Sequence, residues 1–161
     1  MIDKCKVGKD QWTEGFTNVT NDGELTLEQI EGHAWGDPPA HASYLVQAVY
    51  QLRRKPVGQL SAEELRVLLS QQTGVDAVIP YALNVLAGNP LAEGDYYPGD
   101  LLVAVLRLPA EYWQGHSEQA RRTDQVVAPV TAAYLEDHSA PSDVILSAIA
   151  GFATWRQPDD V

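Results

Sequence analysis

Apolar residues recur at steps of three and four along most of this chain, the spacing that places side chains on one face of an α-helix. The clearest case follows Gly74, and Pro80 lies early in it, where a missing amide hydrogen costs least. Its apolar stripe consists of Val75, Val78, Ile79, Ala82, Leu83 and Leu86. No segment alternates apolar and polar residues for long enough to predict a strand. The pattern therefore predicts a helical protein.

Capping and helix-breaking residues predict where the first helices begin and end. Thr26 is placed to cap a helix over residues 27–31, and the prolines of segment 36–39 then force an irregular stretch. Ser61 and Glu64 form a capping box in front of the next stripe, Leu65, Leu68 and Leu69. A helix between the two capping sites, Thr26 and Ser61, is predicted to end before Pro56. Its apolar stripe consists of Leu45, Val46, Val49 and Leu52.

The second half of the chain continues the helical pattern. Pro98 is predicted to start a helix, and a short helix over 111–113 and a long one over about 117–136, kinked at Pro129, follow. Ser139 or Ser142 is expected to cap the last helix, which Trp155 closes. The inward residues are predicted to be Leu101, Leu102, Val105 and Leu106, then Val126, Val127, Val130 and Tyr134, then Ile145, Ala148, Ile149 and Phe152.

These segments add up to an all-α fold, a compact single-domain bundle of about six or seven helices over residues 25–157. Residues 1–24 are polar, lack helical periodicity and end in the turn sequence Asn21-Asp22-Gly23. We expect them to form a loosely ordered extension or a short hairpin. A chain of 161 residues is long enough for one such domain and needs no second.

Charge narrows the class of partner. Asp and Glu number 22 against 11 Lys and Arg, which gives a formal net charge of -11. A protein this acidic repels phosphate backbones and anionic membranes, so direct nucleic-acid or membrane binding is not expected. A basic protein is its natural electrostatic complement. Cys5 is the single cysteine, and the N-terminal segment lacks a continuous apolar stretch, so we expect a cytoplasmic protein.

No metal or cofactor is expected. The histidines, His33, His41, His116 and His138, lie far apart, and Pro38 and Pro39 separate the nearest pair. No shared helical face presents them to one ion. The chain also lacks the nucleophile elbow, the phosphate-cradling glycine loop and the His-Glu-x-x-His motif of common enzymes. The sequence favours a protein without catalytic activity.

The most distinctive segment is an acidic, aromatic stretch over residues 89–100, between two apolar helical patterns. It carries Glu93, Asp95, Tyr96, Tyr97 and Asp100 among prolines and glycines. Three interpretations stand: the carboxylates form an acid and base pair of a hydrolase; they serve as turn and helix-start residues, since Asp100 lies near the start of the next helix; or the segment contacts a partner protein. A scaffold subunit of an oligomer is a further alternative.

A series of short motifs resembles the immunity proteins of contact-dependent growth inhibition systems. The motifs occupy residues 27–32, 35–39, 43–46, 52–56, 64–66, 79–80 and 89–102, in one collinear order that covers about half of the chain. The resemblance implies a cytoplasmic antitoxin, not an enzyme, that binds the toxic C-terminal domain of its own system. Such toxins are often basic nucleases, and the immunity protein would occlude the active site.

Motifs shared by a family of single-toxin inhibitors do not mark the interface, because contact residues should vary with the toxin. Trp35, Pro56, Pro80 and Leu101 are therefore expected to be scaffold residues. The predicted toxin contacts are Glu93, Asp95, Tyr96, Tyr97 and Asp100, since tyrosine is enriched at interface centres and acids complement a basic cleft.

Overall fold

The computed structural model describes residues 23–137 and 142–156, and within these residues the protein is all-α, as predicted. Isolated β-bridges join Thr26 to Pro56 and Glu93 to Pro98. The predicted N-terminal hairpin or extension lies almost wholly outside the described residues. The helices are α2 Leu27–Glu31, α3 Tyr44–Leu52, the 3₁₀ helix η2 Val57–Gln59, α4 Ala62–Ser70, α5 Val75–Gly88, α6 Asp100–Leu106, α7 Ala110–Gln114, α8 Ser117–Asp137 and α9 Asp143–Arg156. The eight α-helices exceed the predicted six or seven by at least one.

The predicted capping residues begin the first helices. Thr26 and Gln29 exchange side-chain and backbone hydrogen bonds in a capping box at α2. Ser61 and Glu64 do the same at α4, with the Ser61 amide donating to Glu64 Oε2 at 2.8 Å. At the other end of the molecule, the Ser142 carbonyl accepts from the Ile145 amide at 2.9 Å directly before α9. Ser139 lies outside the described residues.

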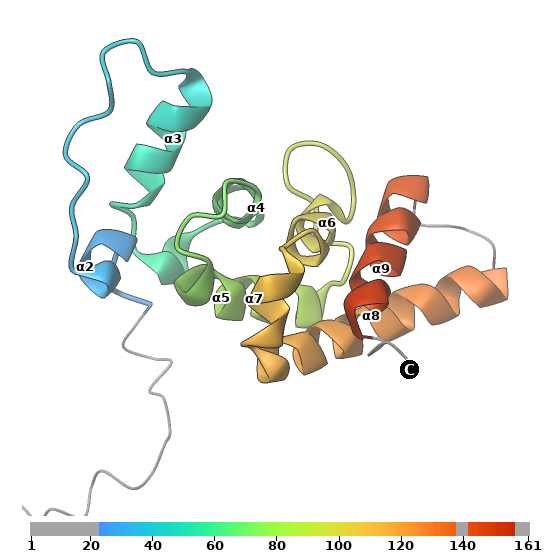
Figure 1. Cartoon of the computed structure of the whole chain (residues 1–161). Coiled ribbons are helices and arrows are strands. Elements are labelled where there is room, and N and C mark those ends of the chain that lie inside the picture. The colour runs from blue at the N-terminus through green and yellow to red at the C-terminus, as the bar shows by residue number, and fades with distance from the viewer. Residues whose placement is uncertain (1–22, 138–141, 157–161) are drawn as a thin grey trace, which may run out of the picture.

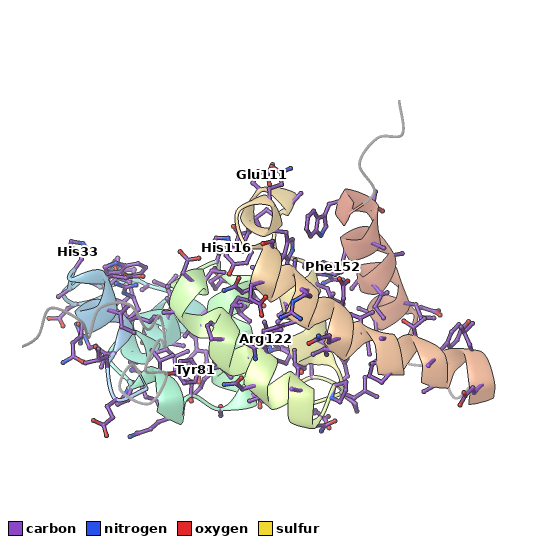
Figure 2. All side chains as sticks on the ribbon, turned by 90° about the horizontal axis from the view of Figure 1, so that it is seen from below. His33, Tyr81, Glu111, His116, Arg122 and Phe152 are labelled. Carbon is purple, nitrogen blue, oxygen red and sulfur yellow. The ribbon has the colours of Figure 1, made fainter. Side chains whose placement is uncertain are left out.

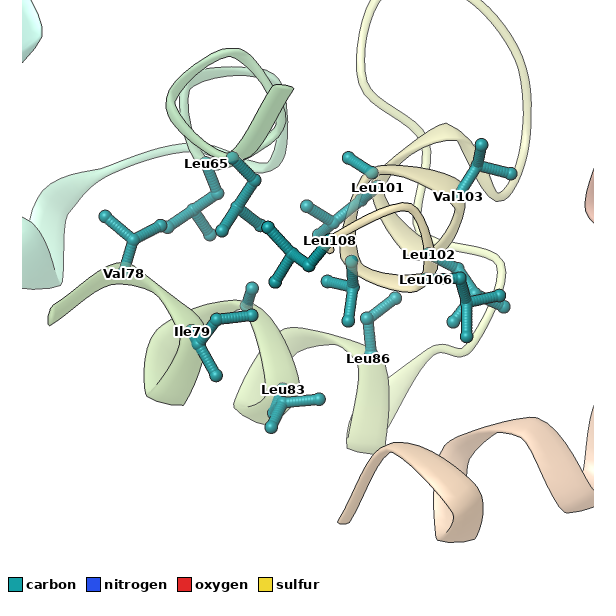
Figure 3. Close-up of a cluster of buried hydrophobic side chains, with 14 of the residues drawn as sticks. Leu65, Val78, Ile79, Leu83, Leu86, Leu101, Leu102, Val103, Leu106 and Leu108 are labelled. Atoms are coloured by element: carbon teal, nitrogen blue, oxygen red, sulfur yellow. The ribbon is translucent and has the colours of Figure 1, made fainter. Parts of the chain in front are cut away.

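The core lies where α4, α5 and α6 meet. The five inward residues of α5 from Val78 to Leu86 are fully buried, and the predicted α4 stripe packs against them. Figure 3 shows side chains of these three helices converging. All seven residues of α6 are buried, where the sequence predicted a single inward stripe. This helix packs against α4 and α5 on some of its sides and against α9 on another, so it has no solvent face.

Two sequence predictions were wrong in detail. Helix α6 begins at Asp100 and not at Pro98, because Gly99 adopts φ +90° and breaks the helical path in front of it. A Cβ on Gly99 would also lie 2.6 Å from Cδ1 of Ile145 on α9. In α3, Val49 and Leu52 are buried as predicted, whereas Leu45 and Val46 are about two-fifths exposed, since only the second half of that helix faces the core.

Figure 1 shows how the helices are arranged in space. Helices α2 and α3 lie at one end, α8 and α9 at the other, and α4, α5 and α6 between them. Near α9, Trp113 packs edge-on against Phe152 at 5.2 Å and stacks on Trp155 at 6.4 Å between ring centroids. On α8, Arg122 lies beside α5 (Figure 2) and donates to Asn84 Oδ1 at 2.7 Å. In the part of the chain that the structure describes, no helix is long and apolar enough to cross a membrane.

Candidate functional site

The acidic, aromatic segment forms a closed loop, residues 89–99, between α5 and α6. Its ends meet because the Gly99 amide donates to the carbonyls of Leu91 and Ala92, at 3.1 and 3.3 Å. Asn89 supports the first turn by accepting from the Leu91 amide at 3.2 Å. In Figure 1 the loop arches out beside α6. A loop whose ends are this close presents its tip as one unit.

The loop is fixed from below by Asp100. This carboxylate is 3% exposed, and its two oxygens accept from two loop amides: Gly94 at 2.6 Å and Tyr96 at 3.2 Å. Hydrogen bonds to a charged acceptor are stronger than neutral ones. Asp100 therefore holds the inside of the loop, and its negative charge also lies in the first turn of α6, where the helix dipole favours it.

A second carboxylate fixes the loop from α4. Glu63 Oε2 accepts from the Asp95 amide at 2.9 Å, and both Glu63 oxygens accept from Arg66, at 2.6 and 2.7 Å. The Arg66 guanidinium lies 3.7 Å from Asp100 Oδ2 and so joins the two acids. We call Glu63, Arg66 and Asp100 the carboxylate clamp. The hydrogen bond from Arg66 holds the pKa of Glu63 below its usual value, with burial opposing and the Asp95 amide assisting.

The clamp leaves no room for a side chain at Gly94. A Cβ there would overlap Glu63 Oε2 and lie 2.9 Å from Asp100 Oδ2. The two carboxylates approach the backbone from opposite elements, α4 and α6, and only a glycine allows both to reach it. Glycine at this position is required for close approach of side chains to the backbone.

The predicted contact residues divide into an exposed and an inner set. Glu93 and Asp95 are exposed, and Tyr96 is 70% exposed with its ring 4.5 Å from the Arg66 guanidinium carbon. Tyr97 is half-buried and packs against the core, and Asp100 lies inside the loop. The structure thus brings all five into one loop and its base, with three of them facing solvent.

Sequence reasoning missed the other two clamp residues. Glu63 and Arg66 lie about 25 residues before the loop, and their spacing of three on a helix gives an ordinary i,i+3 ion pair. Nothing in that spacing indicates contact with the loop. A faint signal existed, because Arg66 follows the inward Leu65 on a helix that must pack closely, and its side chain is only 16% exposed.

The loop presents exposed side chains from a backbone that the carboxylate clamp holds in place. Among the described residues, no group of three or more His, Cys, Asp or Glu side chains is placed to hold a metal ion.

The family model of CDI immunity proteins matches residues 29–123, more than half of the chain. The chain belongs to the CDI immunity protein family. Proteins of this family bind a cognate toxin, and membership supports an immunity, or antitoxin, role for this member. No curated protein matches the chain.

Proposed function

We propose that this CDI immunity protein neutralises a basic nuclease toxin by covering the toxin's active site with the 89–99 loop. The observation that carries the proposal is the way the loop is held. Its exposed acids and tyrosine project from a backbone that three hydrogen bonds fix to the clamp. A surface ordered before binding loses less conformational entropy on association than a flexible one.

The five predicted contact residues take different parts in this proposal. Glu93, Asp95 and Tyr96 contact the toxin, since their side chains face solvent. Tyr97 contributes an edge of its half-buried ring. Asp100 acts indirectly by holding the loop, because its carboxylate is buried and its oxygens are engaged. The acid and base interpretation of these carboxylates finds no support in this arrangement, where Asp100 is committed to the backbone.

The charge balance supports a basic partner. A net charge of -11 attracts a cationic domain over distances comparable to the Debye length, about 10 Å at 0.1 M salt. We infer that the protein acts in the cytoplasm, where an entering nuclease would meet its substrate, and that it blocks the toxin without a catalytic step of its own. Association should slow as salt rises, because screening shortens the reach of the acidic field.

The direct test uses the gene beside the one for this chain, since immunity proteins are usually encoded next to a large secreted protein with a toxic C-terminal domain. That domain is expressed with and without this chain. The expected result is cell survival only in the presence of this chain, and co-purification of a one-to-one complex. A harmless, non-binding product would contradict the proposed function.

The position of the interface is tested with matched charge reversals. Glu93→Lys with Asp95→Lys should weaken the complex about tenfold or more while leaving the unfolding transition unchanged, since substitutions at exposed positions change stability little. The control, Glu24→Lys with Glu136→Lys, makes the same change in net charge at two exposed acids outside the loop. Tyr96→Ala tests the aromatic contact, worth about 2 kcal/mol or more if its ring is an anchor. Equal effects of the two double reversals would place the interface elsewhere.

A further inference from the structure

A cavity of about 240 Å³ opens between α4 and α6, directly below the tyrosines of the 89–99 loop. We call it the socket. Its floor is apolar and buried, formed by Leu69, Val103, Ala104 and Leu108. The rest of its lining is mostly polar: Arg66, Ser70, Gln72, Tyr96, Asp100 and Arg107. The socket therefore continues the surface that we propose for toxin contact, and it has the depth that a flat surface lacks.

Arg107 stands out among the basic residues of this acidic protein. Every other lysine or arginine side chain that the structure describes contacts a carboxylate or, for Arg122, the amide oxygen of Asn84. Arg107 has neither kind of partner within the described residues. Its position at the C-cap of α6 suits a positive charge, but leaves the forked donors of the guanidinium unused. They are available to an acceptor from outside.

Gln72 supplies an independent indication. It is the one described non-glycine residue with positive φ, at 50°. The strain has a local origin, because α4 ends in a Schellman motif: the amides of Gln72 and Thr73 donate to the carbonyls of Leu69 and Leu68, at 3.0 and 2.9 Å. Glycine is the usual residue at this left-handed position.

The left-handed turn caps α4, but glutamine in place of glycine brings no visible gain to the fold. Its side chain is exposed and makes no hydrogen bond within the described part of the chain. A strained residue whose side chain does nothing for the folded state points to a role in function. Gln72 lines the socket together with the unpaired Arg107.

We infer that the socket receives a carboxylate side chain of the toxin. Arg107 would bind it in the two-pronged geometry that guanidinium and carboxylate groups share, and the Gln72 amide would donate to it. This inference rests on the proposed function and names a specificity-determining contact within it. Most pairs across the interface would join acids of this chain to bases of the toxin. One pair with the charges reversed, Arg107 against an acid of the toxin, would fix the register of the complex. A shifted partner would place a basic residue against Arg107.

Binding kinetics of Arg107→Glu test the inference sharply. The substitution makes the net charge two units more negative, so long-range attraction to a basic toxin increases and the association rate should rise slightly. If Arg107 holds a toxin carboxylate, the dissociation rate should rise about tenfold or more at the same time. Arg121→Glu on α8 is the matched control, because it makes the same charge change at an exposed arginine outside the socket. The control should show the faster association with an unchanged dissociation rate.

The two possible failures are distinguishable. If Arg107→Glu behaves like Arg121→Glu, the toxin binds without using the socket: the inference is overturned and the proposed function stands. If the wild-type chain does not bind the toxin at all, the proposed function itself fails. A scan of the toxin completes the test. One acidic residue, when changed to Arg, should weaken binding to the wild-type chain and restore it to Arg107→Glu, and the absence of any such position counts against the socket.

Gln72→Gly adds a test in which stability and binding should move in opposite directions. Relief of the left-handed strain should raise the melting temperature by about 1–3 °C. Loss of the amide should raise the dissociation rate of the toxin severalfold. A variant that is more stable and binds as tightly as the wild type would show that Gln72 makes no contact.

Discussion

Removal of the Asp100 carboxylate is the perturbation that separates the loop from its support. In Asp100→Ala, the amides of Gly94 and Tyr96 lose acceptors at 2.6 and 3.2 Å. A hydrogen bond to a charged group contributes about 1.5–3 kcal/mol. The loop lies at the surface, where water can replace part of each bond, so the lower end of that range applies.

Two smaller contributions add to this loss. A negative charge in the first turn of α6 stabilises the helix by about 0.3–1 kcal/mol. Arg66 also loses the carboxylate 3.7 Å away, although its pair with Glu63 remains. The expected decrease in the free energy of unfolding for Asp100→Ala is about 3–4 kcal/mol. Asp100→Asn keeps one oxygen acceptor and should lose about half as much.

Urea denaturation monitored by tryptophan fluorescence measures the change in the free energy of unfolding. The m-value, the slope of that free energy against urea concentration, is expected to stay constant. Hydrogen exchange at the Gly94 and Tyr96 amides should accelerate more than exchange in α5, because the loop opens before the core does. A decrease below about 0.5 kcal/mol would refute the reasoning, since that is the effect of an ordinary surface substitution.

Three further predictions address the core and the titrating groups. Leu83→Ala, at a fully buried site in α5, should lower the free energy of unfolding by about 2–5 kcal/mol in the same denaturation assay; a change within about 0.5 kcal/mol would mean that Leu83 is not in the core. The pKa of Glu63 is lowered in the folded state, so its stabilising contribution is present above its unfolded value of 4.5 and lost below it. The stability difference between wild type and Glu63→Gln should therefore shrink as the pH falls from 6 to 3, and a constant difference would contradict the ion pair. Burial, assisted by the Asp76 carboxylate, raises the pKa of Tyr112 to about 12. Its contribution to stability is accordingly present below about pH 10 and lost between about pH 10 and 12, and Tyr112→Phe should remove a step near pH 12 from the absorbance titration of the tyrosines.

Local signals in the sequence predicted most of the fold. The capping boxes at Thr26 and Ser61 and the stripe of α5 need only residues a turn or two apart, so one sequence contains them in full. The complete burial of α6 could not be predicted in this way. It depends on α9 packing against a helix that begins more than forty residues before it. The exposure of Leu45 and Val46 likewise depends on which side of α3 other helices leave uncovered.

For the candidate site, composition predicted the segment but not its architecture. The concentration of acids and tyrosines in residues 89–100 predicted an exposed loop, and Glu93, Asp95 and Tyr96 are exposed there. The contact between the Asp95 amide and Glu63 joins residues on different elements, and no periodicity encodes it. The burial of Asp100 could not be predicted from the sequence either. A carboxylate at the start of a helix can face outward or, as here, back under the preceding loop.

The packing of α9 on α6 has a consequence for how this family is compared. The stretch that matches the family model ends inside α8, and the helix that closes the core against α6 lies beyond it. The stretch that matches the family is therefore shorter than the stretch that packs as one folding unit. A chain cut at the end of the shared stretch would expose one side of its most buried helix and should aggregate. An exchange of C-terminal segments between family members would succeed only where the new segment offers an apolar face whose side chain fits against Gly99 as Ile145 does. The end of the chain beyond the shared stretch is thus constrained by its packing on α6.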